Sequence, residues 1–434
     1  MNLHDLAEQA LAKLKREGAD AAQVSVSRTA LTEVNINLSE PSLLRSTTSH
    51  KLSLVGLWDD RKASTDLSDL TPDALASAAA ALRADATSAP QDAANAVSSG
   101  QHAQIRRGPP VADLSALTGA ARELLEFRAR ETPSMMMEES AALHSFTESQ
   151  LLTSAGSHLS VALGNYGLSV FGTARGPGPD GKVHSSSFNY CGGDTDDLRG
   201  APASSRFGIA EMMRELTRSV FTRSLAECLG GKGVGDVVLT PPAVADLLGW
   251  LHGQVSDMAL ISGSSIYRNA VGDLIASPLL SLSSRFDAPG LAAVSADGFA
   301  TPPVQLLQAG RLMTLTPSLY GSRKTGLAHV PTASAGWELV AGNTPMAALL
   351  KGVSRGALVG RLSMGTPAAN GDFSGVIKNS FAVQGGEVGA ALSETMINGN
   401  VAQMLRDVLA VSAERIDTGA SCMPWVRIGG LHFS

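Results

Sequence analysis

The sequence of 434 residues is poor in cysteine and aromatic residues, and it contains no long apolar run. Its three cysteines, Cys191, Cys228 and Cys422, lie far apart and form no C-x-x-C pair, which excludes a paired-cysteine motif and favours a reducing compartment. Aromatic residues make up only 4% of the chain, so its cores must be built from Leu, Val, Ala and Met. No run of about 18 apolar residues occurs, so the sequence predicts no membrane span.

Basic clusters are also missing. The formal net charge is -6, and no stretch of Lys and Arg is dense enough to neutralise a phosphate backbone. Direct binding to nucleic acid is therefore not expected. The amino-terminal segment reads as an amphipathic helix, because Lys13, Lys15 and Arg16 interrupt the apolar stretch that a signal peptide requires. We expect a cytoplasmic protein with no membrane association.

The length of the chain exceeds that of a single hydrophobic core, so we expect two domains. The glycine-rich segment Gly230–Gly235 is the best candidate boundary. Its glycine spacing does not match a phosphate-binding loop, and it precedes a strand whereas such a loop follows one, so a flexible linker is favoured. The predicted fold is α+β, with an N-terminal mixed α/β domain over residues 1–229 and a β-rich C-terminal domain over residues 236–434.

Capping residues and apolar periodicity predict the main elements. In the first domain they indicate helices at 3–14 (capped by Asn2), from Thr71-Pro72 to near Pro90, at 114–125 and at 205–229, strands at 24–26, 34–38 and 52–55, a loop at 91–112, and β structure at 141–192. In the second domain they indicate a strand at 236–239, a helix after Thr240-Pro241, short strands from about residue 290, and a late helix capped by Asn400 with Met404, Leu405, Val408 and Leu409 on its apolar face.

Familiar catalytic spacings are missing. The chain has no G-x-S-x-G elbow and no H-E-x-x-H, and no two of its nine histidines are four or five residues apart. A helical zinc site needs two imidazoles on one side of a helix together with a general base. The sequence therefore assigns no catalytic, cofactor-binding or metal-binding residue.

His252 is the histidine of greatest interest, because it ends an apolar helix five residues before Asp257. It is interpreted either as the remnant of a metal site or, as is favoured, as a helix-end histidine that meets the last carbonyls. Cys422 is either a reactive thiol or, as is favoured, a small buried hydrophobic residue. His329 and Cys422 are the other residues on which an unorthodox site could be built.

Two further segments have a simple structural interpretation. Met135–Met137 could form an adaptable peptide-binding surface, but packing at the edge of an element is favoured. The carboxylates between Asp194 and Asp197 could act as a pair, but a solvated turn is favoured.

A family resemblance emerges in the C-terminal part of the chain. Ser374–Glu387 (SGVIKNSFAVQGGE), Glu394–Asn400 (ETMINGN) and Val401–Leu405 resemble the "SG…NG…G" and "TIAGNL…ML" stretches of the TldD/PmbA (TldE) family. Weaker similarities, in the same order as in the family, are Gly18–Val24 to "GADxAEV", Ser265–Arg268 to "SVYR", Tyr320–Gly326 to "YSARKLG" and Arg427–Gly430 to the closing "IAG".

The resemblance implies a two-domain fold and a role in handling peptides. In this family the TldD subunits are zinc peptidases with an H-E-x-x-x-H motif, whereas TldE/PmbA subunits lack the motif and pair with TldD. The pair is associated with the processing of peptide-antibiotic precursors and the degradation of unfolded peptides, and PmbA has also been called a modulator of DNA gyrase. Here the motif window falls at Leu247–Asp257, where His252 is the only histidine and no glutamate is present.

We therefore expect a non-catalytic TldE/PmbA-like subunit of a TldD–TldE-type metallopeptidase complex. The expected partners are a TldD-like zinc peptidase subunit and a peptide, with self-association possible when the chain is isolated. Zinc is expected in the partner and no cofactor in this chain. Two alternatives stay open: a regulatory protein that acts through protein partners, and an independent peptidase with an unorthodox site at His252, His329 or Cys422.

Overall fold

The computed structural model describes residues 2–332 and 336–434, which form a mixed α/β structure built on two sheets. The first sheet is 8-stranded, with the order β3-β2-β1-β5-β6-β4 and with β7 and β8 added against β6. All its strand pairs are antiparallel except β4 with β6. Its strands are β1 (Ala21–Asn37), β2 (Glu40–Trp58), β3 (Arg61–Leu67), β4 (His102–Arg107), β5 (Met135–Thr153), β6 (His158–Pro177), β7 (Val183–Ser185) and β8 (Asn189–Thr195).

The strands of this sheet are longer than the sequence predicts. The predicted strands at 24–26 and 34–38 are the two ends of the single strand β1, and the strand at 52–55 is the end of β2. The predicted loop at 91–112 contains the strand β4, so that prediction is wrong over 102–107. Residues 27–33 of β1 and residues 40–51 of β2 are partly or fully exposed, and many of them are polar. These parts of the strands therefore show no apolar alternation in the sequence.

The helices of the first half begin where their capping residues predict. Asn2 caps α1 (Leu3–Arg16) and Thr71 caps α2 (Pro72–Ser88). The helix predicted over 205–229 is wrong as a single element, because α4 ends at Arg218 and a new helix is capped by Ser224 and Glu227 in a capping box. The remaining helices are α3 (Leu114–Glu131), the short 3₁₀ helix Ala203–Ser205, α4 (Ile209–Arg218) and α5 (Leu225–Leu229).

The second sheet is 13-stranded and is built entirely from the second half of the chain. Its strands are β9 (Gly233–Leu239), β10 (Leu282–Ser284), β11 (Gln305–Gln308), β12 (Arg311–Leu312), β13 (Trp337–Leu339), β14 (Arg355–Val359), β15 (Arg361–Ser363), β16 (Asp372–Lys378), β17 (Phe381–Gln384), β18 (Glu387–Ala391), β19 (Thr395–Asn400), β20 (Val408–Asp417) and β21 (Ser421–Phe433). Its helices are α6 (Pro241–Val255), α7 (Asp257–Ser262), α8 (Leu319–Thr325), α9 (Met346–Lys351) and α10 (Val401–Arg406).

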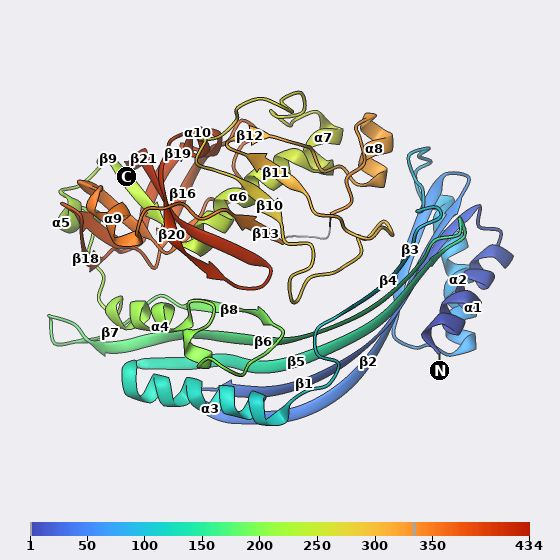
Figure 1. Ribbon diagram of the computed structural model, residues 1–434, viewed down its shortest axis with the longest axis horizontal. Coiled ribbons are helices and arrows are strands. Elements are labelled where there is room, and N and C mark those ends of the chain that lie inside the picture. Colours follow the sequence, from blue (N-terminus) through green and yellow to red (C-terminus); the bar gives the residue numbers. More distant parts are fainter. Residues whose placement is uncertain (1, 333–335) are drawn as a thin grey trace.

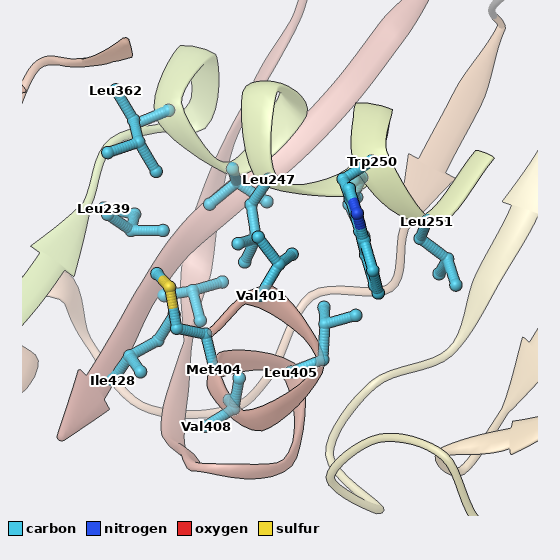
Figure 2. Packing of buried hydrophobic residues seen from close by; sticks show 14 of the residues in the cluster. Leu239, Leu247, Trp250, Leu251, Leu362, Val401, Met404, Leu405, Val408 and Ile428 are labelled. Atoms are coloured by element: carbon cyan, nitrogen blue, oxygen red, sulfur yellow. The ribbon is translucent and has the colours of Figure 1, made fainter. Parts of the chain in front are cut away.

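The core of the second half lies between α6, α10 and β21 (Figure 2). Leu247 and Leu251 of α6 are buried in the same cluster as Leu405 of α10 and Ile428 of β21. Asn400 caps α10 as predicted, but α10 ends at Arg406, so Val408 and Leu409 lie on β20 and not on the helix.

The segment at Gly230–Gly235 is fixed to the second sheet. Gly230 ends α5 in the left-handed conformation, and β9 begins at Gly233. The Arg355 guanidinium donates hydrogen bonds to the carbonyl oxygens of Leu229 (3.2 Å) and Val234 (2.8 Å), and also to that of Gly231. The glycine-rich composition therefore serves a tight turn that is anchored by one arginine.

The second half lies over the concave face of the first sheet, with β8 and α4 between them (Figure 1). The Asp194 amide of β8 donates a 3.0 Å hydrogen bond to the Thr418 carbonyl in the β20–β21 turn. The Arg107 guanidinium donates to the Phe286 carbonyl at 3.0 Å. No helix in the described part of the chain is long and apolar enough to cross a membrane.

Candidate functional site

A cleft of about 520 Å³ opens between the first sheet and the second half of the chain. Gln23, Val55 and Lys62 line it from the sheet. Asp257 and Tyr320 line it from the opposite side. We name it the interdomain cleft. The segment that follows the carboxyl end of α6 lines it, so the sequence window Leu247–Asp257 meets the first sheet here.

Asp257 holds the start of α8 in the cleft wall. Its carboxylate accepts a hydrogen bond from the Ser318 amide at 2.8 Å and another from the Ser318 hydroxyl. A side chain at Gly321 would place its Cβ 1.9 Å from an Asp257 oxygen, so only glycine fits this contact. The carboxylate five residues after His252 thus acts as a structural cap.

His329 forms a pair with Asp297 beside the same cleft. The distance from His329 Nε2 to Asp297 Oδ2 is 3.1 Å, and the same oxygen accepts from the Leu319 amide at 2.7 Å. The ring of Phe299 packs edge-on against the imidazole, with centroids 4.5 Å apart. Over residues 2–332 and 336–434 no Ser, Thr or Cys side chain hydrogen-bonds to a histidine, so His329 has no adjacent nucleophile to activate.

Helix α8 connects the cleft to the first half of the chain through Asp92. The Tyr320 hydroxyl donates to Asp92 Oδ2 at 2.8 Å, and the Lys324 ammonium lies 2.7 Å from the same oxygen. The hydrogen bond from Lys324 is the largest of the contacts that lower the pKa of Asp92, to about 2. The stretch Tyr320–Gly326, which resembles a family motif, therefore clamps the two halves of the molecule together.

His252 lies on α6 but does not contact the cleft-lining carboxylate. Its ring stacks on Trp337, with centroids 4.4 Å apart and planes inclined by 28°. The buried Nε2 atom has no hydrogen-bond partner among the described residues. The predicted contact with the last helix carbonyls is therefore not made by this atom. Burial lowers the pKa of His252 to about 4, so the imidazole is neutral at physiological pH.

The cysteines lie in strands or helices and not in the cleft. Cys422 is buried on β21, and burial raises the pKa of its thiol, which agrees with the interpretation of a small core residue. The Cys191 thiol donates to the Phe207 carbonyl at 2.6 Å, and burial raises its pKa to about 12. Neither thiol is activated as a nucleophile.

The two remaining sequence candidates have structural roles. Met135 and Met137 are fully buried, and only Met136 is exposed, which matches the predicted packing at the edge of a strand. The solvated turn predicted at Asp194 is wrong for that residue. Asp194 lies in β8 and accepts a 2.6 Å hydrogen bond from Asn165, and burial raises its pKa.

The zinc that the resemblance implies for the partner has no matching ligand set among the described residues of this chain. In the described ranges no three His, Cys, Asp or Glu side chains are grouped so that they could hold a metal ion. At the window on α6, His252 faces Trp337 and Asp257 is committed to Ser318. No catalytic step can therefore be assigned to a metal bound here.

Comparison with known proteins shows which family the chain resembles. Residues 232–434 match the PmbA/TldA metallopeptidase C-terminal domain. Over 441 aligned positions the chain is 24% identical to the metalloprotease PmbA of Escherichia coli O157:H7, and the match covers 95% of this chain and 93% of that protein. The C-terminal part of the chain therefore carries a domain of the PmbA/TldD type. The expected α+β fold and the resemblance found in the sequence are thus confirmed.

Solved structures share the fold over nearly the whole chain. TldE from Thermococcus kodakarensis superimposes with a TM-score of 0.79 at 17% identity, covering 99% of this chain and 100% of that one. A protein from Bacteroides thetaiotaomicron, described as a putative modulator of DNA gyrase, superimposes with a TM-score of 0.80 at 20% identity, covering 99% and 98%. At such identities these matches show that the chain shares the fold of those proteins.

Proposed function

We propose that this chain is a TldE/PmbA-like, non-catalytic subunit of a two-subunit metallopeptidase. Its partner would be a TldD-like chain that carries H-E-x-x-x-H and binds zinc, and its substrates would be small or unfolded peptides. The supporting observation is the state of α6: the one histidine of the window is neutral, stacked on Trp337 and unable to share a metal with a second imidazole.

An open sheet edge offers a surface for the partner. Residues 42–50 of β2 pair with β1 on one side, whereas β3 covers only Leu52–Trp58 on the other. Residues 40–51 of β2 are exposed, and this end of the hairpin also exposes three leucines. The exposed fractions are 63% for Leu38, 43% for Leu43 and 54% for Leu44. A partner strand or an extended peptide can pair with such an edge through its backbone.

Gly375 and Gly399 of the C-terminal motif do not lie at an open sheet edge. A Cβ at Gly375 would lie 2.8 Å from the Ser363 carbonyl, and one at Gly399 would lie 2.8 Å from the Leu431 side chain. These glycines therefore make room for neighbouring strands of the same chain.

Co-expression with a TldD-like chain tests the proposal. We expect a complex that hydrolyses an unstructured peptide, and we expect no hydrolysis by this chain alone. A chelator should abolish the activity of the complex, and Leu44→Lys should weaken the complex without changing the melting temperature of the isolated chain. Chelator-sensitive hydrolysis by the isolated chain would support an independent peptidase. Recovery of a topoisomerase in place of a peptidase partner would support a regulatory role.

A further inference from the structure

A second cavity, separate from the interdomain cleft, lies between α4 and the amino end of α6. Its volume is about 310 Å³, and we name it the α4–α6 pocket. Strand β8 closes one side of it, and β20 and β21 close the other. Much of the wall is apolar, with Met212, Pro241, Ala245, Ile416, Met423 and Trp425 contributing.

Three carboxylates line this pocket: Glu211 and Glu215 from successive turns of α4, and Asp246 from α6. Asp246 accepts a hydrogen bond from the Leu362 amide at 3.3 Å. Across the described residues Glu215 makes no side-chain hydrogen bond and no ion pair within 4.0 Å. Glu215 is partly buried, and this burial raises its pKa to about 7, whereas the positive charge of Arg218 acts in the opposite direction.

The nearby arginines do not neutralise these groups by direct contact. The Arg361 guanidinium lies over the rings of Phe188 (4.9 Å) and Tyr190 (5.3 Å). The Arg218 guanidinium lies over the ring of Phe381 at 4.7 Å. Both cations are thus held by aromatic faces and make no ion pair with these carboxylates. Glu211 and Asp246 are exposed residues, and Glu215 is partly buried.

We propose that the α4–α6 pocket binds the ammonium or guanidinium group of a peptide's Lys or Arg side chain, with Glu215 as its ion-pair partner. The apolar wall would cover the methylene stem while the carboxylates meet the charged end. Tyr190, with 61% of its surface exposed, lies at the wall where the peptide backbone would cross. This inference deepens the proposed function, because the ligand is a peptide.

Binding to the purified full-length chain tests the assignment without any peptidase partner. Two labelled heptapeptides are compared by fluorescence anisotropy at pH 8, one with a central lysine and one with a central norleucine. We expect the lysine peptide to bind about ten-fold more tightly. We expect Glu215→Gln to remove that preference and leave the norleucine peptide unchanged. The matched control is Glu126→Gln, on the exposed face of α3, which should behave like the unchanged chain.

A second variant guards against a fold defect at Glu215. Ala245→Leu fills the pocket from α6 and should weaken both peptides, with the melting temperature of each variant measured alongside. The affinity for lysine should rise between pH 6 and pH 8 as Glu215 ionises, with Glu211, Asp246, Cys191, Arg218 and Arg361 as the titratable and charged groups around it.

Three results would overturn the inference: equal affinity for the two peptides, no effect of Glu215→Gln, or displacement by n-butylamine as effective as displacement by unlabelled lysine peptide. The last result would identify a free amine as the ligand. Failure of the chain to pair with a metallopeptidase would not affect these measurements, so the two proposals fail separately.

Discussion

His252 stacks on Trp337 with the ring centroids 4.4 Å apart, and its buried Nε2 atom has no hydrogen-bond partner in the described part of the chain. An imidazole in this position behaves as an aromatic core residue. Its ring packs against Trp337 and stays neutral, and His252 is not among the residues that line the interdomain cleft. Helix α6, with Leu247 and Leu251, is part of the hydrophobic core of the second half.

The first prediction concerns acid stability. The pKa of His252 is about 4 in the folded chain, against about 6.5 when unfolded. Below pH 6.5 the unfolded chain therefore binds the proton first. The folded state should lose up to about 3 kcal/mol of stability as the pH falls from 6.5 to 4. His252→Phe keeps the stack on Trp337 and removes this loss, which denaturant unfolding at pH 5 and pH 7.5 can measure.

An equal loss of stability in His252→Phe and the unchanged chain would contradict this assignment. At pH 7.5 the variant should unfold within about 1 kcal/mol of the unchanged chain, because a neutral ring is replaced by an apolar ring of similar shape.

The second prediction separates two leucines that the sequence places on the same helical face. Leu405 is fully buried on α10, whereas Leu409 on β20 is 52% exposed. Leu405→Ala should cost about 2–5 kcal/mol of unfolding free energy. Leu409→Ala should cost no more than about 0.5 kcal/mol. Urea titration of both variants decides the point, and similar losses would show that the helix continues beyond Arg406.

Local signals predict where helices begin but not where strands end. Asn2, Thr71 and Asn400 each accept a backbone hydrogen bond near the start of a helix, which is a short-range effect that the sequence reveals. The exposed half of β2 has no apolar alternation, because neither of its faces is buried there. The capping box from Ser224 to Glu227 is a signal in the sequence for a helix separate from α4.

The candidate site depends on contacts between distant residues, so the sequence could not reveal it. Asp92 meets Tyr320, and Asp297 meets His329, only after the two halves fold against each other. Glu215 has no partner that sequence spacing could have shown. The sequence shows directly that the H-E-x-x-x-H motif is absent. It does not show that His252 stacks on Trp337, because the two residues are far apart along the chain.

The third prediction concerns alkaline pH. The pKa of Glu215 is raised to about 7 in the folded chain, so the folded state binds the proton more tightly than the unfolded state. Stability should therefore fall between pH 4.5 and pH 8 as Glu215 ionises, by up to about 3 kcal/mol. Glu215→Gln should flatten this decline. Glu126→Gln should leave it unchanged, and a flat profile in the unchanged chain would contradict the burial of this carboxyl group.

The fourth prediction concerns the clamp between the two halves. Asp92→Ala removes the acceptor of both Tyr320 and Lys324, so α8 should open more often. Hydrogen–deuterium exchange should be faster in the amides of residues 319–325, with little change in the core strands. Asp66→Ala is the matched control, since it breaks an exposed pair with Lys51 away from α8. Unchanged exchange in α8 would show that the clamp does not restrain it.

Peptide hydrolysis by separated and recombined subunits tests the central claim most directly. The purified chain, a TldD-like chain with H-E-x-x-x-H, and their mixture are assayed on one unstructured peptide with and without a chelator. The account predicts that this chain alone is inactive, that the mixture exceeds the partner alone, and that glutamine in place of the partner's motif glutamate abolishes hydrolysis. Chelator-sensitive hydrolysis by this chain alone would contradict it.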